Sequence, residues 1–118
     1  YFRKTSGGHF VTIASVAGIR PLRQAPAYSA TKRYKIHYTS ALAAMAHRNK
    51  ENIRFTTIKP GFIDTELLHR KYPFMVSLEK GSRLIYNAIE KKKRSVILPG
   101  RWRWIALLWK LIPFWEKF

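Results

Sequence analysis

The amino-acid sequence predicts an α/β fold in which α-helices cover a parallel β-sheet. Three runs of apolar and β-branched residues, at 9–14, 53–58 and 95–98, are typical of buried strands. Helix-like segments lie between them, one from about residue 27 to residue 47 and one that opens at residue 77. Because strand and helix alternate along the chain, right-handed crossovers should keep the strands parallel.

Residues 1–27 are predicted to form the end of a helix, a strand and a loop, in that order. Residues 1–8 are typical of the tail of a helix, which Ser6-Gly7-Gly8 would close. The strand at 9–14 ends at Ser15. Residues 16–27 contain glycine and two prolines, so we expect a loop there.

The remaining elements follow from composition and spacing. The helix at 27–47 is rich in alanine, which favours helix and allows close packing. A polar turn precedes the strand 53–58, and Pro60-Gly61 follows that strand. Ser77 is the expected N-cap of the next helix. Its apolar face comprises Leu84, Ile85, Ala88 and Ile89, and the basic run 91–94 ends it.

The length of 118 residues is enough for at most one domain. The absence of cysteine excludes disulfide bonds and thiolate metal sites. The net charge of +17 favours an anionic partner, whether nucleic acid, a membrane surface or an acidic protein segment. No nucleic-acid-binding motif accompanies the charge, so we expect no specific nucleic-acid partner. No metal site is expected either, because the histidines lack metal-ligand spacing: His9, His37, His47 and His69.

Residues 101–118 differ in composition from residues 1–100 and are predicted to form a basic, apolar helical tail. This tail carries all four tryptophans of the chain: Trp102, Trp104, Trp109 and Trp115. It is too short to span a membrane and is interrupted by Pro113. Its arginines and lysines would suit a helix on a membrane surface, with tryptophan at headgroup depth. Packing on the same protein, at its substrate entrance or against a second subunit, is the open alternative.

The stretch Tyr28-Ser29-Ala30-Thr31-Lys32 carries the chemistry of the chain. On a helix, positions i and i+4 share a face, so Tyr28 and Lys32 should project side by side. A nearby cation favours the ionised form of a phenol, which is otherwise a poor proton donor or base near neutral pH. Ser15 lies thirteen residues before Tyr28, at the end of a predicted strand.

Together these features resemble the carboxyl-terminal half of the short-chain dehydrogenase/reductase family. The resemblance covers roughly residues 7–99 and includes the spacing of Ser15 and Tyr28, Tyr28-x-x-x-Lys32 and the loop between them. It also includes the strand after the helix and the sequence 60–65 that follows it. It implies that residues 1–100 are the carboxyl-terminal half of an NAD(P)-binding Rossmann-like domain, a doubly wound parallel sheet represented by its last three strands.

The resemblance also implies a reaction, the reduction of a carbonyl or the oxidation of a secondary alcohol with NAD or NADP. Tyr28 would be the acid and base, Lys32 would favour its ionised form and bind the cofactor ribose, and Ser15 would hold the substrate oxygen.

Further cofactor contacts are implied at the end of the second strand. Pro60 and Gly61 would bend the chain there, and the Ile63 backbone and Thr65 hydroxyl would anchor the nicotinamide carboxamide. Asp64 is expected to cap a following helix. Apolar residues after the turn suggest a bulky, lipid-like substrate: Phe62, Leu67, Leu68, Tyr72, Phe74 and Met75.

One part of the family pattern is not found, because the six glycines form no dinucleotide fingerprint. We therefore expect a fragment that lacks the dinucleotide-binding half. The isolated chain should be inactive and should not bind dinucleotide tightly, and a micromolar dissociation constant by calorimetry would contradict this.

The alternative is a non-catalytic, truncated module that binds a partner subunit or an anionic membrane through its tail. In either case we expect a cytoplasmic protein, with peripheral membrane contact left open. The resemblance further implies a homo-oligomer formed through the Tyr28 helix.

Overall fold

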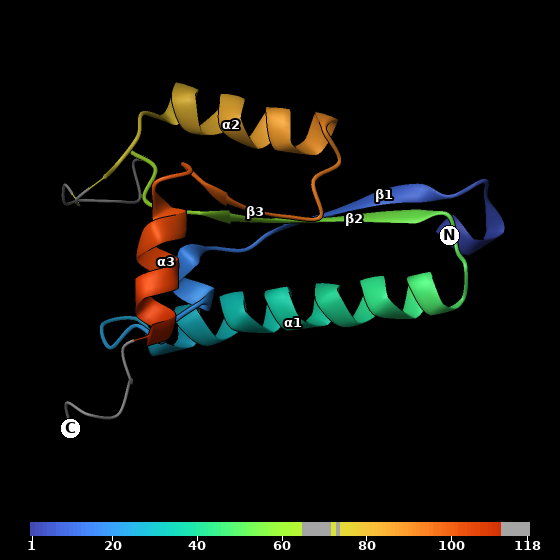
Figure 1. The fold of residues 1–118 in the computed structure, drawn as a ribbon, viewed down its shortest axis with the longest axis horizontal. Coiled ribbons are helices and arrows are strands. Elements are labelled where there is room, and N and C mark those ends of the chain that lie inside the picture. Colours follow the sequence, from blue (N-terminus) through green and yellow to red (C-terminus); the bar gives the residue numbers. More distant parts are fainter. Residues whose placement is uncertain (65–71, 73, 112–118) are drawn as a thin grey trace.

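The computed structural model describes residues 1–64, 72 and 74–111 and shows the predicted α/β fold. A parallel sheet is covered by one helix on each face, α1 on one and α2 on the other (Figure 1). A third helix, α3, stands across the end of the sheet. The strands are β1 (Gly8–Ile13), β2 (Ile53–Pro60) and β3 (Ser95–Leu98), and the helices are α1 (Pro26–Arg48), α2 (Leu78–Glu90) and α3 (Trp102–Leu111).

The sheet has the strand order β1-β2-β3, with both pairings parallel. The first pairing runs from Gly8 opposite Ile53 to Ile13 opposite Ile58. The second runs from Thr57 opposite Ser95 to Pro60 opposite Leu98. Because the strands are parallel, their carboxyl ends meet at one edge of the sheet, where ligands bind in open α/β folds.

The core lies along the central strand. Ile58 and Thr56 of β2 are completely buried, and Thr39 and Ala46 of α1 are nearly so. The helix α1 begins at a proline, whose fixed φ suits the first helical turn, and ends close to the predicted boundary. Its buried residues, Ser29, Thr39 and Ala46, are all small.

The N-cap predicted for α2 is confirmed. The Ser77 hydroxyl accepts a hydrogen bond from the Lys80 backbone N–H at 3.3 Å. The first turn of α2 also packs closely, because a Cβ atom at Gly81 would lie 2.9 Å from Ile63 Cδ1.

The prediction for residues 1–8 is wrong. A single 3₁₀ turn, Phe2–Lys4, replaces the helix tail, and Gly8 is the first residue of β1. Gly7 has a φ of +119°, which only glycine adopts readily, so it reverses the chain into the strand. A Cβ atom at Gly8 would collide with the Phe2 ring. The two glycines therefore start a strand rather than end a helix.

Two boundaries also differ from the prediction. The second strand continues to Pro60, because pairing with β3 extends to Leu98. The predicted loop after Ser15 contains a 3₁₀ turn, η2 (Val16–Gly18), whose residues are buried.

The predicted C-terminal apolar helix is present as α3, while residues 112–118 lie outside the described part of the chain. Within the residues described, no helix has the length and apolar character needed to cross a membrane.

Candidate active site

Ser15 lies at the carboxyl end of β1 and is almost fully buried. Its hydroxyl accepts a hydrogen bond from the Ala17 backbone N–H at 3.1 Å, which caps η2. The same hydroxyl lies 3.5 Å from the Pro60 carbonyl oxygen, to which it donates. Ser15 therefore joins the ends of β1 and β2 at the carboxyl edge of the sheet.

Tyr28 and Lys32 lie side by side on the first turns of α1, as their spacing predicts. Lys32 Nζ is 5.3 Å from the centre of the Tyr28 ring, within the range of a cation–π contact. Tyr28 is 49% exposed, so its ring faces open space. Burial lowers the pKa of the Lys32 ammonium below 10.5, and the nearby charge of Lys35 acts in the same direction.

Ser29, which the sequence analysis did not single out, ties these two parts of the site together. Its buried hydroxyl donates to the Ala17 carbonyl at 2.7 Å, lies 3.3 Å from the Arg20 carbonyl, and accepts from the Leu22 N–H at 3.2 Å. The loop after Ser15 is therefore fastened to the helix turn that carries Tyr28. The only feature of the sequence that indicated this anchoring role for Ser29 is its place as a polar residue next to Tyr28, and that indication is weak.

Close packing supports the same arrangement at Gly18. A Cβ atom there would lie 2.8 Å from the Lys32 backbone carbon and 2.9 Å from the Arg33 nitrogen. Only a residue without a side chain lets η2 approach α1 so closely. The backbone around Lys32 is thus held against the loop that Ser15 caps.

The turn at Pro60-Gly61 follows the end of β2. Gly61 N–H donates to the Leu98 carbonyl at 2.7 Å, which holds the turn against β3. On its other side Gly61 meets Trp102 of α3, whose indole Nε1 would lie 2.3 Å from an added Cβ atom. The position of the turn thus depends on a residue more than forty positions later in the chain.

Ile63 lies in a short extended segment that pairs with Val76. The Phe62 carbonyl accepts from Val76 N–H at 3.1 Å, and Asp64 N–H donates to the Val76 carbonyl at 2.8 Å. Since backbone groups alternate in direction along an extended chain, the N–H and C=O of Ile63 point away from Val76. Thr65, and any helix that Asp64 caps, lie outside the described residues.

An aromatic cluster surrounds this turn. Phe62 stacks on Tyr72 with ring centres 4.4 Å apart, and its edge contact with Trp102 spans 5.5 Å. Trp102 also contacts Phe74 and Trp109. The sequence predicted apolar residues here and left open that the tail packs on the same protein, which Trp102 does at the centre of the cluster. Leu67 and Leu68 lie outside the described residues.

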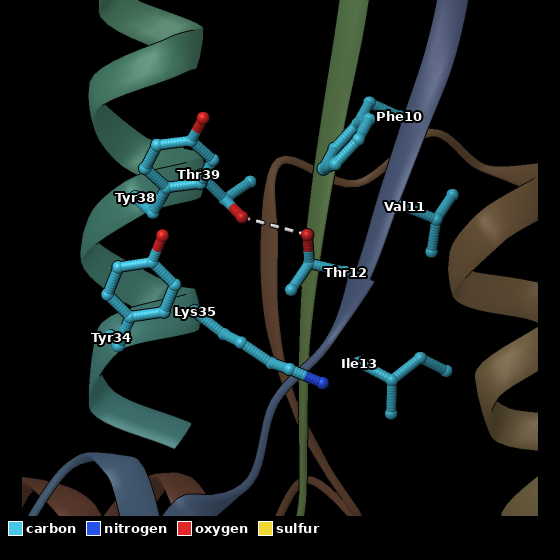
Figure 2. Close-up of a pocket in the computed structure, with 8 residues that line it drawn as sticks. All are labelled: Phe10, Val11, Thr12, Ile13, Tyr34, Lys35, Tyr38 and Thr39. Atoms are coloured by element: carbon cyan, nitrogen blue, oxygen red, sulfur yellow. Dashed lines mark hydrogen bonds between the residues drawn. The ribbon is translucent and has the colours of Figure 1, made fainter. Parts of the chain in front are cut away.

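A separate hollow opens between β1 and α1 and contains none of the predicted site residues (Figure 2). Within it the hydroxyls of Thr12 and Thr39 form a hydrogen bond of 2.8 Å. The rings of Tyr34 and Tyr38 stack 5.5 Å apart at its rim. These two tyrosines pack against each other, and neither has a lysine four residues later in the sequence.

Among the histidines of the chain, His9 lies in β1, within the predicted strand 9–14. Its Nε2 lies 2.8 Å from the buried Thr56 hydroxyl of β2. His69 lies outside the described residues.

Sequence comparison identifies relatives of the chain. The family model described as short chain dehydrogenase matches residues 1–75. A 15-hydroxyprostaglandin dehydrogenase [NAD(+)] of Mus musculus is 37% identical over 71 residues, which cover 58% of this chain and 26% of that protein. An uncharacterized oxidoreductase of Mycobacterium tuberculosis is 28% identical over 118 residues, which cover 95% of this chain and 46% of that protein. The chain thus spans about a quarter to a half of the length of these relatives.

Structural comparison gives the same fold. A short chain dehydrogenase from Burkholderia cenocepacia in complex with NADP matches with a TM-score of 0.73 and 22% identity, over 86% of this chain and 42% of the other. A short-chain dehydrogenase from Sphingobium yanoikuyae in complex with NADPH matches with a TM-score of 0.72 and 21% identity, over 99% of this chain and 50% of the other. With the family model matching more than half of its residues, the chain belongs to the short-chain dehydrogenase family.

Proposed function

We propose that the protein is an NAD(P)-dependent oxidoreductase that reduces a carbonyl group or oxidises a secondary alcohol, with Tyr28 as the acid and base. The observation that carries the proposal is the Lys32 ammonium beside the Tyr28 ring, on a helix fastened to the Ser15 loop. Tyr28 and Lys32 share α1, Ser15 follows β1, and the hydrogen bond from Ser29 to the Ala17 carbonyl joins the two parts.

Each side chain has a part in proton transfer. In the reducing direction Tyr28 gives the proton of its hydroxyl to the substrate oxygen, and in the oxidising direction it removes one. The Ser15 hydroxyl donates a hydrogen bond to the same oxygen, where negative charge develops. Its present acceptor, the Pro60 carbonyl, is 3.5 Å away, so this weak bond is easily exchanged for the substrate. Lys32 stabilises the ionised phenol.

The residues after β2 fit the nicotinamide end of the cofactor. NAD or NADP, when bound, supplies or accepts a hydride at the substrate carbon. The outward-pointing N–H and C=O of Ile63 match the acceptor and donor of a carboxamide. Pro60 and Gly61 set the direction of this segment, Thr65 adds a hydroxyl, and Tyr28 and Lys32 bind the ribose. Two of the matched structures hold NADP or NADPH, which is consistent with this assignment.

The pyrophosphate end of the cofactor requires residues beyond those in this sequence. The glycines of the chain form no fingerprint, and the matched structures are about twice as long or longer. We therefore assign to this chain the catalytic half of a larger site. Calorimetric titration of the isolated chain with NAD and NADP should show no tight binding.

The substrate in this proposal is apolar and lipid-like. The aromatic cluster lines the turn beside Gly61, and Tyr72 and Phe74 remain partly exposed there. Five of the matched relatives are named for a hydroxylated prostaglandin, and a compound of this kind combines a long apolar body with an alcohol.

The test is Tyr28→Phe in the protein expressed from its full gene. Because the Tyr28 ring is half exposed, the variant should fold normally, and because Lys32 still binds the ribose, it should keep its cofactor affinity. Turnover should fall by a factor of about 10² to 10⁴, the usual contribution of a general acid. The matched control is Tyr34→Phe on the same helix, which should leave turnover unchanged. Turnover retained in Tyr28→Phe would remove Tyr28 from its role.

A further inference from the structure

The helix α3 has two apolar stripes on opposite sides. With about 100° between successive residues, positions i, i+3, i+4 and i+7 share one side of a helix. One stripe, the inner stripe, comprises Trp102, Ile105, Ala106 and Trp109. The other, the outer stripe, comprises Trp104, Leu107, Leu108 and Leu111. An ordinary surface helix of a globular protein has only one such stripe.

The inner stripe accounts for the packing of α3 on the rest of the chain. Trp102 is only 4% exposed and contacts the turn at Gly61, and Ala106 is equally buried. The outer stripe is left uncovered within the described residues: Trp104 is 72% exposed, Leu108 is 57% exposed, and the other two leucines are at least half exposed. Four large apolar side chains on ten residues form a contiguous patch of the kind that marks an interaction site.

The charge around the outer stripe is of one sign. Residues 99–111, from the end of β3 through α3, contain three basic residues, Arg101, Arg103 and Lys110, and no acidic residue. Arg101 and Arg103 are exposed at the first turn of α3. A second copy of the chain would bring the same positive charge to this face, which costs energy, whereas an anionic surface would complement it.

We propose that the outer stripe of α3 is a lipid-binding surface that lies flat on an anionic membrane. Tryptophan and leucine side chains enter the boundary between headgroups and acyl chains, and the arginines contact anionic headgroups. The helix has ten residues and a length of about 15 Å, half the thickness of the hydrocarbon core, so it lies on the membrane and does not cross it.

The position of α3 gives this surface a role. The helix stands across the end of the sheet where the strands β2 and β3 terminate, beside the turn at Gly61 (Figure 1). If the proposed oxidoreductase function holds, a lipid-like substrate reaches the aromatic cluster from the membrane without crossing water. The lipid contact itself does not depend on turnover.

The test is sedimentation of the chain with vesicles of phosphatidylcholine alone and of phosphatidylcholine mixed with phosphatidylserine. Binding is expected to the mixed vesicles and to weaken at high salt. Leu108→Glu should reduce the partition coefficient by about tenfold or more, because it removes an exposed leucine that would enter the lipid and adds a negative charge. Tyr28→Phe should bind as the unchanged chain does, which separates lipid binding from catalysis.

The matched control is Leu78→Glu at the start of α2. Leu78 is 58% exposed, so the two substitutions change the same residue type at equal exposure and add the same charge. Leu78→Glu should change vesicle binding by less than about twofold, as expected for a surface change outside the contact. If both variants lost vesicle binding equally, the loss would come from the change in net charge and not from the outer stripe, which would overturn the proposal.

Two further outcomes would also overturn it. Equal binding to both kinds of vesicle would show that anionic lipid is not the partner. An absence of vesicle binding, together with self-association that Leu108→Glu abolishes in sedimentation velocity, would assign the outer stripe to a second copy of the chain.

Discussion

Gly61 and Trp102 are in such close contact that no side chain fits between them. A Cβ atom at Gly61 would lie 2.3 Å from the indole Nε1 and 2.6 Å from Cδ1. The indole N–H is buried and has no hydrogen-bond partner among the described residues. The turn after β2 and the first residue of α3 are therefore positioned by each other.

Gly61→Ala should displace the Trp102 ring and destabilise the chain. Over-packing of this kind costs about 1–3 kcal/mol in free energy of unfolding. Denaturation followed by tryptophan fluorescence measures the loss. The control is Gly100→Ala, where an added Cβ atom meets nothing within 4 Å and stability should stay within about 0.5 kcal/mol. Equal stability of the two variants would contradict the contact.

Ser29→Ala should loosen the loop between Ser15 and α1. The change leaves the buried Ala17 carbonyl and the Leu22 N–H without their partner, at a cost of about 1–3 kcal/mol. Hydrogen exchange should increase at residues 17–22 and remain unchanged in β2. Ser40→Ala is the matched control, because that exposed hydroxyl bonds only within its own helix. Unchanged exchange in Ser29→Ala would refute the anchoring role.

The lowered pKa of Lys32 should make stability rise with pH in the alkaline range. Because burial, aided by Lys35, lowers the folded-state pKa below 10.5, the unfolded chain binds more protons in the interval just below that value. The penalty of the buried charge is thus fully present at neutral pH and is relieved as pH rises through the folded pKa. Lys32→Met should remove both the penalty and this part of the pH dependence in urea denaturation.

A companion variant tests the second cause. Lys35→Gln should move the pKa of Lys32 back toward 10.5, as measured by NMR titration of its side chain. If the pKa of Lys32 is the same with and without Lys35, desolvation alone lowers that pKa.

The hydroxyl pair Thr12–Thr39 should behave as a coupled unit between β1 and α1. Thr39→Val leaves the Thr12 hydroxyl without its 2.8 Å partner and should cost about 1–2 kcal/mol (Figure 2). Replacing both threonines by valine should cost less than the sum of the two single changes, since no hydroxyl is then left unpaired. Additive losses in a double-mutant cycle would contradict the coupling.

The residues predicted correctly from sequence are those governed by local rules. Ser77 caps α2 because a serine at the N-cap position can accept a hydrogen bond from the free backbone N–H three residues later. Tyr28 and Lys32 meet because a helix places i and i+4 together. The alternating strands and helices, and hence the fold class, follow from periodicity alone.

The features that sequence could not predict join segments distant in the chain. Gly61 meets Trp102 across 41 positions, and Ser29 reaches back twelve residues to Ala17. Gly7 and Gly8 have the composition of a helix stop, yet they start a strand because β1 pairs with β2 and the Phe2 ring covers Gly8. Only tertiary packing decides between such readings.

The free side of β1 has a practical consequence for handling the chain. In the described sheet β1 pairs only with β2, so its other side presents backbone donors and acceptors to solvent, with Phe10 and Ile13 partly exposed beside them. Such an edge is a template for adding another strand. At high concentration the isolated chain should aggregate by edge-to-edge strand pairing, and dilute solutions or a lysine placed on this edge should limit that aggregation.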